Sequence, residues 1–264
     1  MVRKKMKRVK PGRFVLNCIP STGVETDWGY GDAISAGAVA DADPPPARDL
    51  REPWWRVRNQ QDTGACVGFA AADGVLRWHY VRAGWIQKKE IPSPRFIWMA
   101  NKESDEITSY PTTFIETAGT QVKLALAVAR KFGCVLEGDL PMKGGLSKLS
   151  TAAFYTKAAA LRIASYHNLG SDPAAWRRWI ANQGPILTRL DVDATWDGVG
   201  KKGILDVYRP DTTRGGHAVC LVGYTDRHFI VRNSWGAAWG DEGFAYALDA
   251  YAAEAFTEAY GAVL

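Results

Sequence analysis

Apolar positions at helical spacing dominate the first part of the chain. Between Cys66 and about Arg82 the bulky apolar residues recur every three or four positions, and Gly84 is a suitable terminator. A second, shorter helix is predicted over residues 93–102, where apolar and polar residues also alternate at this spacing. The pattern therefore predicts that a helix begins at Cys66.

Two more segments carry helix boundary signals at both ends. One begins at Thr120, a possible N-cap, and runs to Gly133, a residue that commonly ends helices. The other has Asp172 as its N-cap, a proline in its first turn, and Gly184 as its stop. Both are predicted as amphipathic helices.

The second part of the chain is dominated by short β-branched and aromatic runs between turns. Such runs predict strands, here over residues 186–192, 203–208, 217–225, 228–235 and 243–248. Because helices come first and antiparallel-looking strands second, the expected fold class is α+β, with a helical lobe and a β lobe.

The charge of the chain is concentrated at its N-terminus. The formal net charge is +5, but residues 1–13 hold seven Lys or Arg and no acid. Without those seven, 26 basic residues stand against 28 acidic ones. We interpret residues 1–45 as a basic tail and flexible arm, interrupted by a proline triplet, and residues 46–264 as the folded domain. The tail could bind nucleic acid or an acidic partner, or simply be solvated.

The composition indicates in which cellular compartment the protein resides and which classes of protein it argues against. No apolar run approaches the roughly 20 residues that a membrane span needs, so no membrane span is expected. The tail does not have the pattern of a secretion signal. Four scattered cysteines without framework or zinc-ligand spacing argue against a disulfide scaffold and a zinc site. We expect a cytoplasmic protein with free thiols.

Three residues form a possible catalytic set. Cys66 lies where a helix begins, and helix dipoles favour a thiolate there, although a lone cysteine beside alanines is usually a small buried hydrophobe. His217 opens an apolar strand directly after two glycines, and Asn233 follows 16 residues later on the next strand. An antiparallel hairpin can bring His217 and Asn233 together, which gives the order nucleophile, base and orienting amide.

The segments around these residues resemble the papain family of cysteine peptidases. Residues 59–70 (NQQDTGACVGFA), 216–224 (GHAVCLVGY) and 233–244 (NSWGAAWGDEGF) are similar to its nucleophile, histidine and asparagine segments. The Cys66-to-His217 separation of 151 residues is close to the family's roughly 130–150. The resemblance covers about residues 46–250. It implies a two-lobe fold with a cleft between a helical lobe, about 56–155, and a β lobe, about 156–264.

The resemblance also implies roles for individual residues. Cys66 would be the nucleophile, His217 the general base and later the acid, and Asn233 its orienter. Gln60 would complete an oxyanion hole, and Trp235 would cover the His217–Asn233 bond. The substrate would be a peptide or protein, bound without any metal or cofactor. The residues expected to contact it are Gly64, Ala65, Gly216, Ala218, Arg189 and Trp235.

The sequence departs from the family pattern at several places. Thr63 replaces a cysteine that usually forms a disulfide, and Val67 replaces the common tryptophan. No segment resembles the usual inhibitory pro-segment, so control is expected from a partner, from the arm or from restricted expression. Arg189 stands where small apolar residues are usual. It could favour an acidic side chain in the substrate, or it could point to solvent.

Other thiols and imidazoles have no evident role. Cys134 and Cys220 are expected in the core, and Cys18, in the arm, has no partner in view. The remaining histidines, His79, His167 and His228, lack an acid or thiol at ligand spacing. Two alternatives to a peptidase stay open. The same triad could serve an acyltransferase or ligase, or the fold could be a scaffold with an idle site.

Overall fold

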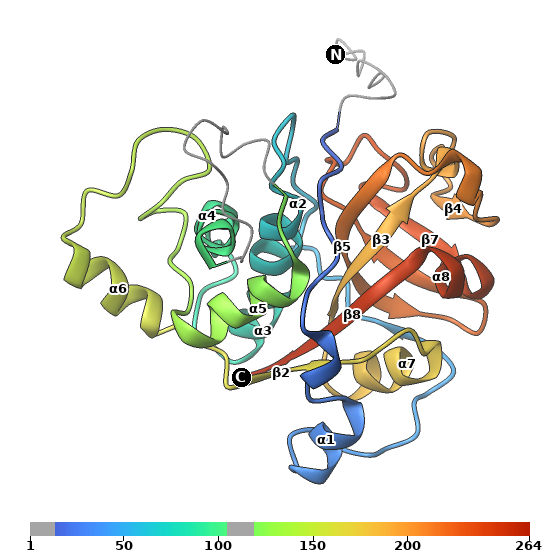
Figure 1. The fold of residues 1–264 in the computed structure, drawn as a ribbon, viewed down its shortest axis with the longest axis horizontal. Coiled ribbons are helices and arrows are strands. Elements are labelled where there is room, and N and C mark those ends of the chain that lie inside the picture. Colours follow the sequence, from blue (N-terminus) through green and yellow to red (C-terminus); the bar gives the residue numbers. More distant parts are fainter. Residues whose placement is uncertain (1–13, 105–118) are drawn as a thin grey trace.

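The computed structural model describes residues 14–104 and 119–264 and confirms the α+β class. The basic tail, residues 1–13, lies outside the described residues. Helices from the first part of the chain gather on one side of the molecule and strands from the second part on the other (Figure 1). None of the described helices is both long and apolar enough to cross a membrane.

A continuous helical segment from Cys66 to Arg82 passes through the centre of the molecule. It comprises α2 (Cys66–Gly68), a π-helical stretch (Phe69–Leu76) and α3 (Arg77–Arg82). The predicted extent of this helix is confirmed. Its π-helical part was not predicted, because the spacing of apolar residues does not distinguish a π-helix from an α-helix. Short π-helical segments are frequent at functional sites.

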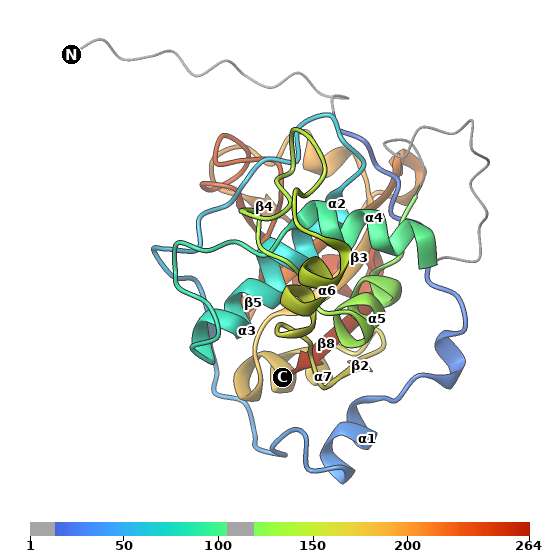
Figure 2. The same ribbon diagram turned by 90° about the vertical axis from the view of Figure 1, so that its left-hand side faces the viewer.

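Of the other helices of this half, the first two along the chain pack against the central one, and the last contacts the first through the ring pair Phe96–Phe154. They are α4 (Pro94–Ser104), α5 (Val122–Lys131) and α6 (Thr151–Ala159), and Figure 2 shows them in front of the strands. The sequence analysis predicted the first two and missed α6. The side chain of Ser150 caps α6 by accepting a hydrogen bond from the Ala153 amide.

The other half is built on one sheet with strand order β2-β8-β3-β5-β6-β7-β4, and β1 pairs with β5. All pairs are antiparallel except β4 with β7. The strands are β1 (Arg48–Asp49), β2 (Ser165–Asn168), β3 (Ile186–Val192), β4 (Ile204–Leu205), β5 (Gly215–Tyr224), β6 (His228–Arg232), β7 (Phe244–Leu248) and β8 (Phe256–Val263).

Five of these strands were predicted, β4 as a longer run, whereas β1, β2 and β8 were missed. The helix α7 (Pro173–Asn182) begins as expected, with the Asp172 carboxylate accepting hydrogen bonds from the amides of Ala174 and Ala175. A further short helix, α8 (Asp249–Ala255), leads into β8. In the N-terminal region, α1 (Tyr30–Ser35) follows a 3₁₀ turn (Val24–Thr26). Two more 3₁₀ turns, Ala194–Trp196 and Pro210–Thr212, precede β4 and β5.

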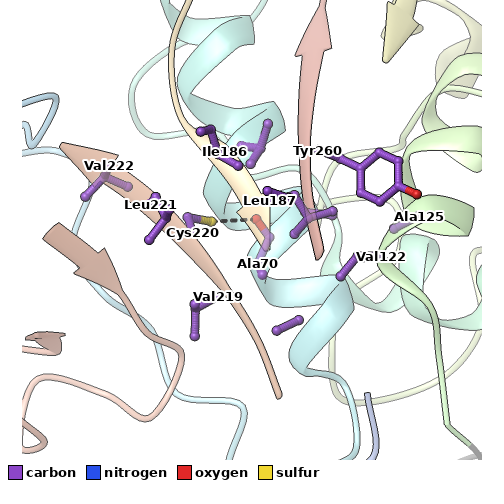
Figure 3. Packing of buried hydrophobic residues seen from close by; sticks show 14 of the residues in the cluster. Ala70, Val122, Ala125, Ile186, Leu187, Val219, Cys220, Leu221, Val222 and Tyr260 are labelled. Atoms are coloured by element: carbon purple, nitrogen blue, oxygen red, sulfur yellow. Dashed lines mark hydrogen bonds between the residues drawn. The ribbon is translucent and has the colours of Figure 1, made fainter. Parts of the chain in front are cut away.

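The central helix packs directly on the sheet. Figure 3 shows Ala70 of the helix against Cys220 of β5, whose Sγ donates a 2.9 Å hydrogen bond to the Ala70 carbonyl. A side chain at Gly74 would collide with the Cys220 sulfur, which explains the glycine there. Cys220 is fully buried, as predicted, and so is Cys134. This packing fixes the direction in which the start of the helix points.

A buried ionic cluster joins the same helix to the sheet. Asp73, on the helix, binds Arg77 at 3.0 Å and Arg232, the last residue of β6, at 2.7 Å. The carboxylate is fully buried and both arginines are nearly so. Because Arg232 precedes Asn233, the cluster ties the position of Asn233 to the helix that begins at Cys66.

Candidate active site

Cys66 lies at the first turn of α2, as the sequence predicted. Its side chain is fully buried, and the preceding Gly64 and Ala65 are buried as well. Backbone amides at a helix start favour an anion. The sulfur therefore lies at the N-terminal end of the central helix, near the Ala218 backbone of the sheet.

His217 and Asn233 come together as the predicted hairpin requires. His217 lies in β5 and Asn233 directly follows the antiparallel neighbour β6. The His217 Nε2–H donates to the Asn233 Oδ1 at 2.8 Å, with the ring tautomer assigned from this bond. Nδ1 has no other hydrogen-bond partner among the described residues. The ring is thus held through Nε2, which leaves Nδ1 available to act as a base.

The surroundings of Cys66 favour its thiolate. A hydrogen bond from the Cys18 thiol lowers the pKa of Cys66 well below its ordinary value, although burial acts in the opposite direction. A hydrogen bond and charge interaction with His217, and a bond from the Ala218 amide, lower this pKa further. Hydrogen bonds to a charged form stabilise that form. The site is therefore arranged to hold a sulfur anion.

Two tryptophans shield the imidazole. The Trp235 ring lies 4.9 Å from the His217 ring, centroid to centroid, and Trp196 meets the same ring edge-on at 5.9 Å. Both tryptophans are buried. Trp235 thus lies against the ring, and its role in covering the His217–Asn233 bond stays a prediction. Trp196 was not predicted as a site residue, because it arrives from a separate 3₁₀ turn.

Gln60 is held rigidly beside the loop that leads to Cys66. Its side-chain oxygen accepts a 2.6 Å hydrogen bond from the Ser234 hydroxyl, and its side-chain nitrogen donates to the Thr63 carbonyl at 2.9 Å. One N–H of the amide is left over from these bonds. Ser234 is a residue that the sequence analysis missed, although it lies between Asn233 and Trp235.

The N-terminal arm occupies the space between the two halves. In Figure 1 this segment, dark blue, runs between the helices and the sheet. The Phe14 ring stacks on Trp235 with centroids 4.3 Å apart and the planes 1° from parallel. The Cys18 amide donates to the Gly216 carbonyl at 3.0 Å. A side chain at Gly216 would collide with the Cys18 carbonyl, so this glycine permits the close approach.

The arm is also bound to the helical half. The Thr120 amide donates to the Asn17 carbonyl at 3.3 Å, and the Ile19 amide donates to the Thr120 carbonyl at 3.0 Å. The expectation that Cys18 has no partner was wrong. Cys18 is only 2% exposed and its thiol is in hydrogen-bonding contact with Cys66.

Arg189, in β3, faces the arm. Its Nε donates to the Cys18 carbonyl at 3.1 Å, and its guanidinium forms a 2.9 Å ion pair with Asp191. The side chain is 7% exposed, so the alternative that it points to solvent was wrong. A preference for an acidic substrate side chain stays a prediction. The Asp191 carboxylate already neutralises part of the Arg189 charge.

Comparisons with known proteins identify relatives. A sequence model that describes the papain family cysteine proteases matches residues 44–258 of this chain. Among curated proteins, mouse cathepsin K is 32% identical over 193 residues, which are 72% of this chain and 54% of that protein. Mouse cathepsin F is 24% identical over 213 residues, or 75% of this chain and 42% of that protein. The chain thus spans about half the length of these relatives.

Solved structures share the fold. Xylellain, a cysteine protease from Xylella fastidiosa, superposes with a TM-score of 0.75 at 24% identity. The match covers 97% of this chain and 98% of that one. The proform of the ragweed pollen allergen Amb a 11, also a cysteine protease, gives a TM-score of 0.66 at 21% identity over 86% of this chain and 67% of that one.

Proposed function

Because the chain belongs to the papain family of cysteine proteases, we propose that it hydrolyses peptide bonds with Cys66 as nucleophile and His217 as base. One observation carries this proposal. The His217 ring is fixed by Asn233 through Nε2, and Cys18 and His217 together lower the pKa of the buried Cys66 against the effect of burial. A thiolate, a base and a group that orients the base are what thiol catalysis needs.

In the first step the Cys66 thiolate attacks the carbonyl carbon of the substrate. The S–C bond forms and the carbonyl oxygen takes up negative charge. The oxyanion then collapses, the C–N bond breaks, and His217 donates a proton to the leaving amine. The free N–H of Gln60 is available for the oxyanion. Such donors contribute about 2.7–4 kcal/mol to transition-state stabilisation.

In the second step a water molecule hydrolyses the acyl-enzyme. His217 takes a proton from the water, hydroxide attacks the acyl carbon, and the C–S bond breaks to regenerate the Cys66 thiolate. Asn233 keeps the ring aligned through both steps, and the rings of Trp235 and Trp196 exclude water from the bond that orients it.

Residues 14–19 must leave before a substrate can bind. They contact Gly216 and Trp235, which flank His217 and Asn233 in the sequence, and they also bind Thr120 of the helical half. The state described is therefore a closed one, and the arm acts as an intramolecular competitor of the substrate.

Cleavage of a peptide library tests this function. We expect the full chain to cleave peptides and the Cys66→Ala variant to be inactive, whereas Cys134→Ala, which changes a buried cysteine outside the site, retains activity. Mass spectrometry with and without added amines identifies the acyl acceptor. Cleavage that persists in Cys66→Ala contradicts the proposal, and exclusive transfer to amines would assign an acyltransferase.

A further inference from the structure

Cys18 and Cys66 interact with each other in the interior of the protein. Both side chains are buried, both belong to the same apolar cluster, and the two are in hydrogen-bonding contact. Neither is in a disulfide. Cys18 comes from the arm and Cys66 from the central helix, so a covalent bond between them would join the arm to the catalytic sulfur.

The backbone of the arm fixes Cys18 at this place from three sides. Its amide binds the Gly216 carbonyl at 3.0 Å and its carbonyl accepts from the Arg189 Nε at 3.1 Å. The neighbouring Asn17 and Ile19 both bind Thr120 of the helical half. Because both walls hold the backbone, the Cys18 sulfur stays beside Cys66 whenever the arm is closed.

We propose that Cys18 and Cys66 are a disulfide-forming pair, oxidised by hydrogen peroxide, that locks the arm in the cleft until a dithiol reductant cleaves the bond. The disulfide regulates activity only if the proposed peptidase function holds, whereas its formation does not depend on that function. Nothing in the chemistry of the bond requires a substrate or an external partner protein.

The reaction balances in two steps. When the arm lifts, the Cys66 thiolate attacks one oxygen of the peroxide; an S–O bond forms, the O–O bond breaks, and the departing hydroxide takes a proton from His217 to leave as water. When the arm closes, His217, which is now neutral, takes the Cys18 proton, and the Cys18 thiolate attacks the sulfenic sulfur of Cys66. The S–S bond forms, the S–O bond breaks, and the hydroxide leaves with the Cys18 proton as a second water.

The other two cysteines are poor competitors for the oxidant. Burial raises the pKa of Cys220 to about 12 and raises that of Cys134 further. Since the thiolate is the reactive form, both stay inert at neutral pH. Burial, together with its bond to Cys66, also raises the pKa of Cys18, which therefore attacks second and not first.

Peptide mapping of the full chain after mild peroxide treatment tests the proposal. Free thiols are alkylated, the protein is digested and the cross-linked peptides are identified by mass spectrometry. We expect one disulfide, between Cys18 and Cys66, with Cys134 and Cys220 alkylated. Peptidase activity should fall by about tenfold or more and return with dithiothreitol.

A matched variant separates a lock from simple damage. In Cys18→Ser the sulfenic acid has no resolving thiol, so Cys66 should advance to the sulfinic acid and dithiothreitol should not restore activity. Cys134→Ala should behave as the unmodified chain. Irreversible oxidation of Cys66 with Cys18 left free in the unmodified chain would overturn the proposal. The mapping needs no turnover, so a chain that cleaves nothing but forms the bond would refute the peptidase and leave the pair standing.

Discussion

At the scale of single residues, Cys66 depends on its neighbours for its charge. Its hydrogen bonds come from the arm, through Cys18, and from the sheet, through His217 and Ala218. Burial alone would keep the thiol protonated, and these contacts outweigh it. The proposed nucleophile thus interacts with residues that are distant in sequence.

This arrangement predicts a thiolate at unusually low pH. Because the pKa of Cys66 is lowered, the sulfur should stay ionised as the pH falls through and below the ordinary thiol range, and protonate only in more acidic solution. Burial raises the pKa of Cys18, Cys134 and Cys220, so they absorb little there. A thiolate absorbance titration of the full chain should show one early transition, absent from Cys66→Ala; its presence in both proteins would contradict the assignment.

Asn233 orients the ring of His217 and is open to a direct test. Asn233→Ala removes the acceptor of the 2.8 Å hydrogen bond and lets the imidazole turn, so kcat/KM should fall by roughly 10²-fold. Asn182→Ala, which removes an amide bound to the Ala42 carbonyl far along α7, is the control and should change little. Equal effects of the two substitutions would remove Asn233 from the site.

At the scale of elements, the Asp73 cluster joins the helix that bears Cys66 to the strand that leads to Asn233. The carboxylate holds both Arg77 and Arg232 in a buried environment. Breaking such a pair leaves uncompensated buried charge. The cluster therefore contributes to the relative position of the catalytic groups as well as to stability.

Asp73→Asn should lower the free energy of unfolding by about 3–5 kcal/mol, because two buried arginines lose their counter-charge. Asp139→Asn, which breaks a pair with the more exposed Lys157, should cost no more than about 1 kcal/mol. Urea unfolding of both variants measures the difference. Similar values for the two would show that the cluster is not a structural tie.

Elements with strong local signals were predictable from the sequence. The Asp172 cap and the β-branched run Ile186–Val192 are signals that depend only on residues close together in the sequence. Both elements that they predict, α7 and β3, are present. The helix α6 was missed after a glycine-containing stretch although Ser150 supplies a cap. The strand β8 was missed because its pairing with β2 and β3 depends on distant segments.

At the scale of the whole molecule, the arm lies between the helices and the sheet, and in our proposal it decides whether a substrate can enter. The pairing of His217 with Asn233 could be predicted because both residues lie in segments of recognisable pattern. The contact of Cys18 with Cys66 could not, since it joins positions 48 residues apart through an arm without strong periodicity. Only the fold shows that the arm lies between the two halves.

Phe14→Ala should open the cleft more often. The substitution removes the stack on Trp235, and a loss of about 1–2 kcal/mol in arm binding corresponds to a factor of roughly 5–30 in the closed-to-open ratio. Peptide turnover should rise accordingly. Trp28→Ala, which removes a 62% exposed ring from the same N-terminal region, should leave turnover unchanged. No increase in Phe14→Ala would show that the arm does not limit access.

The most direct test of the whole account is the site and rate of labelling by an epoxysuccinyl thiol inhibitor, followed by mass spectrometry. The account predicts a single adduct on Cys66, formed faster in Phe14→Ala than in the unmodified chain and slowed by roughly 10²-fold in His217→Ala. No adduct on Cys66 in Phe14→Ala, or equal labelling rates with and without His217, would contradict it.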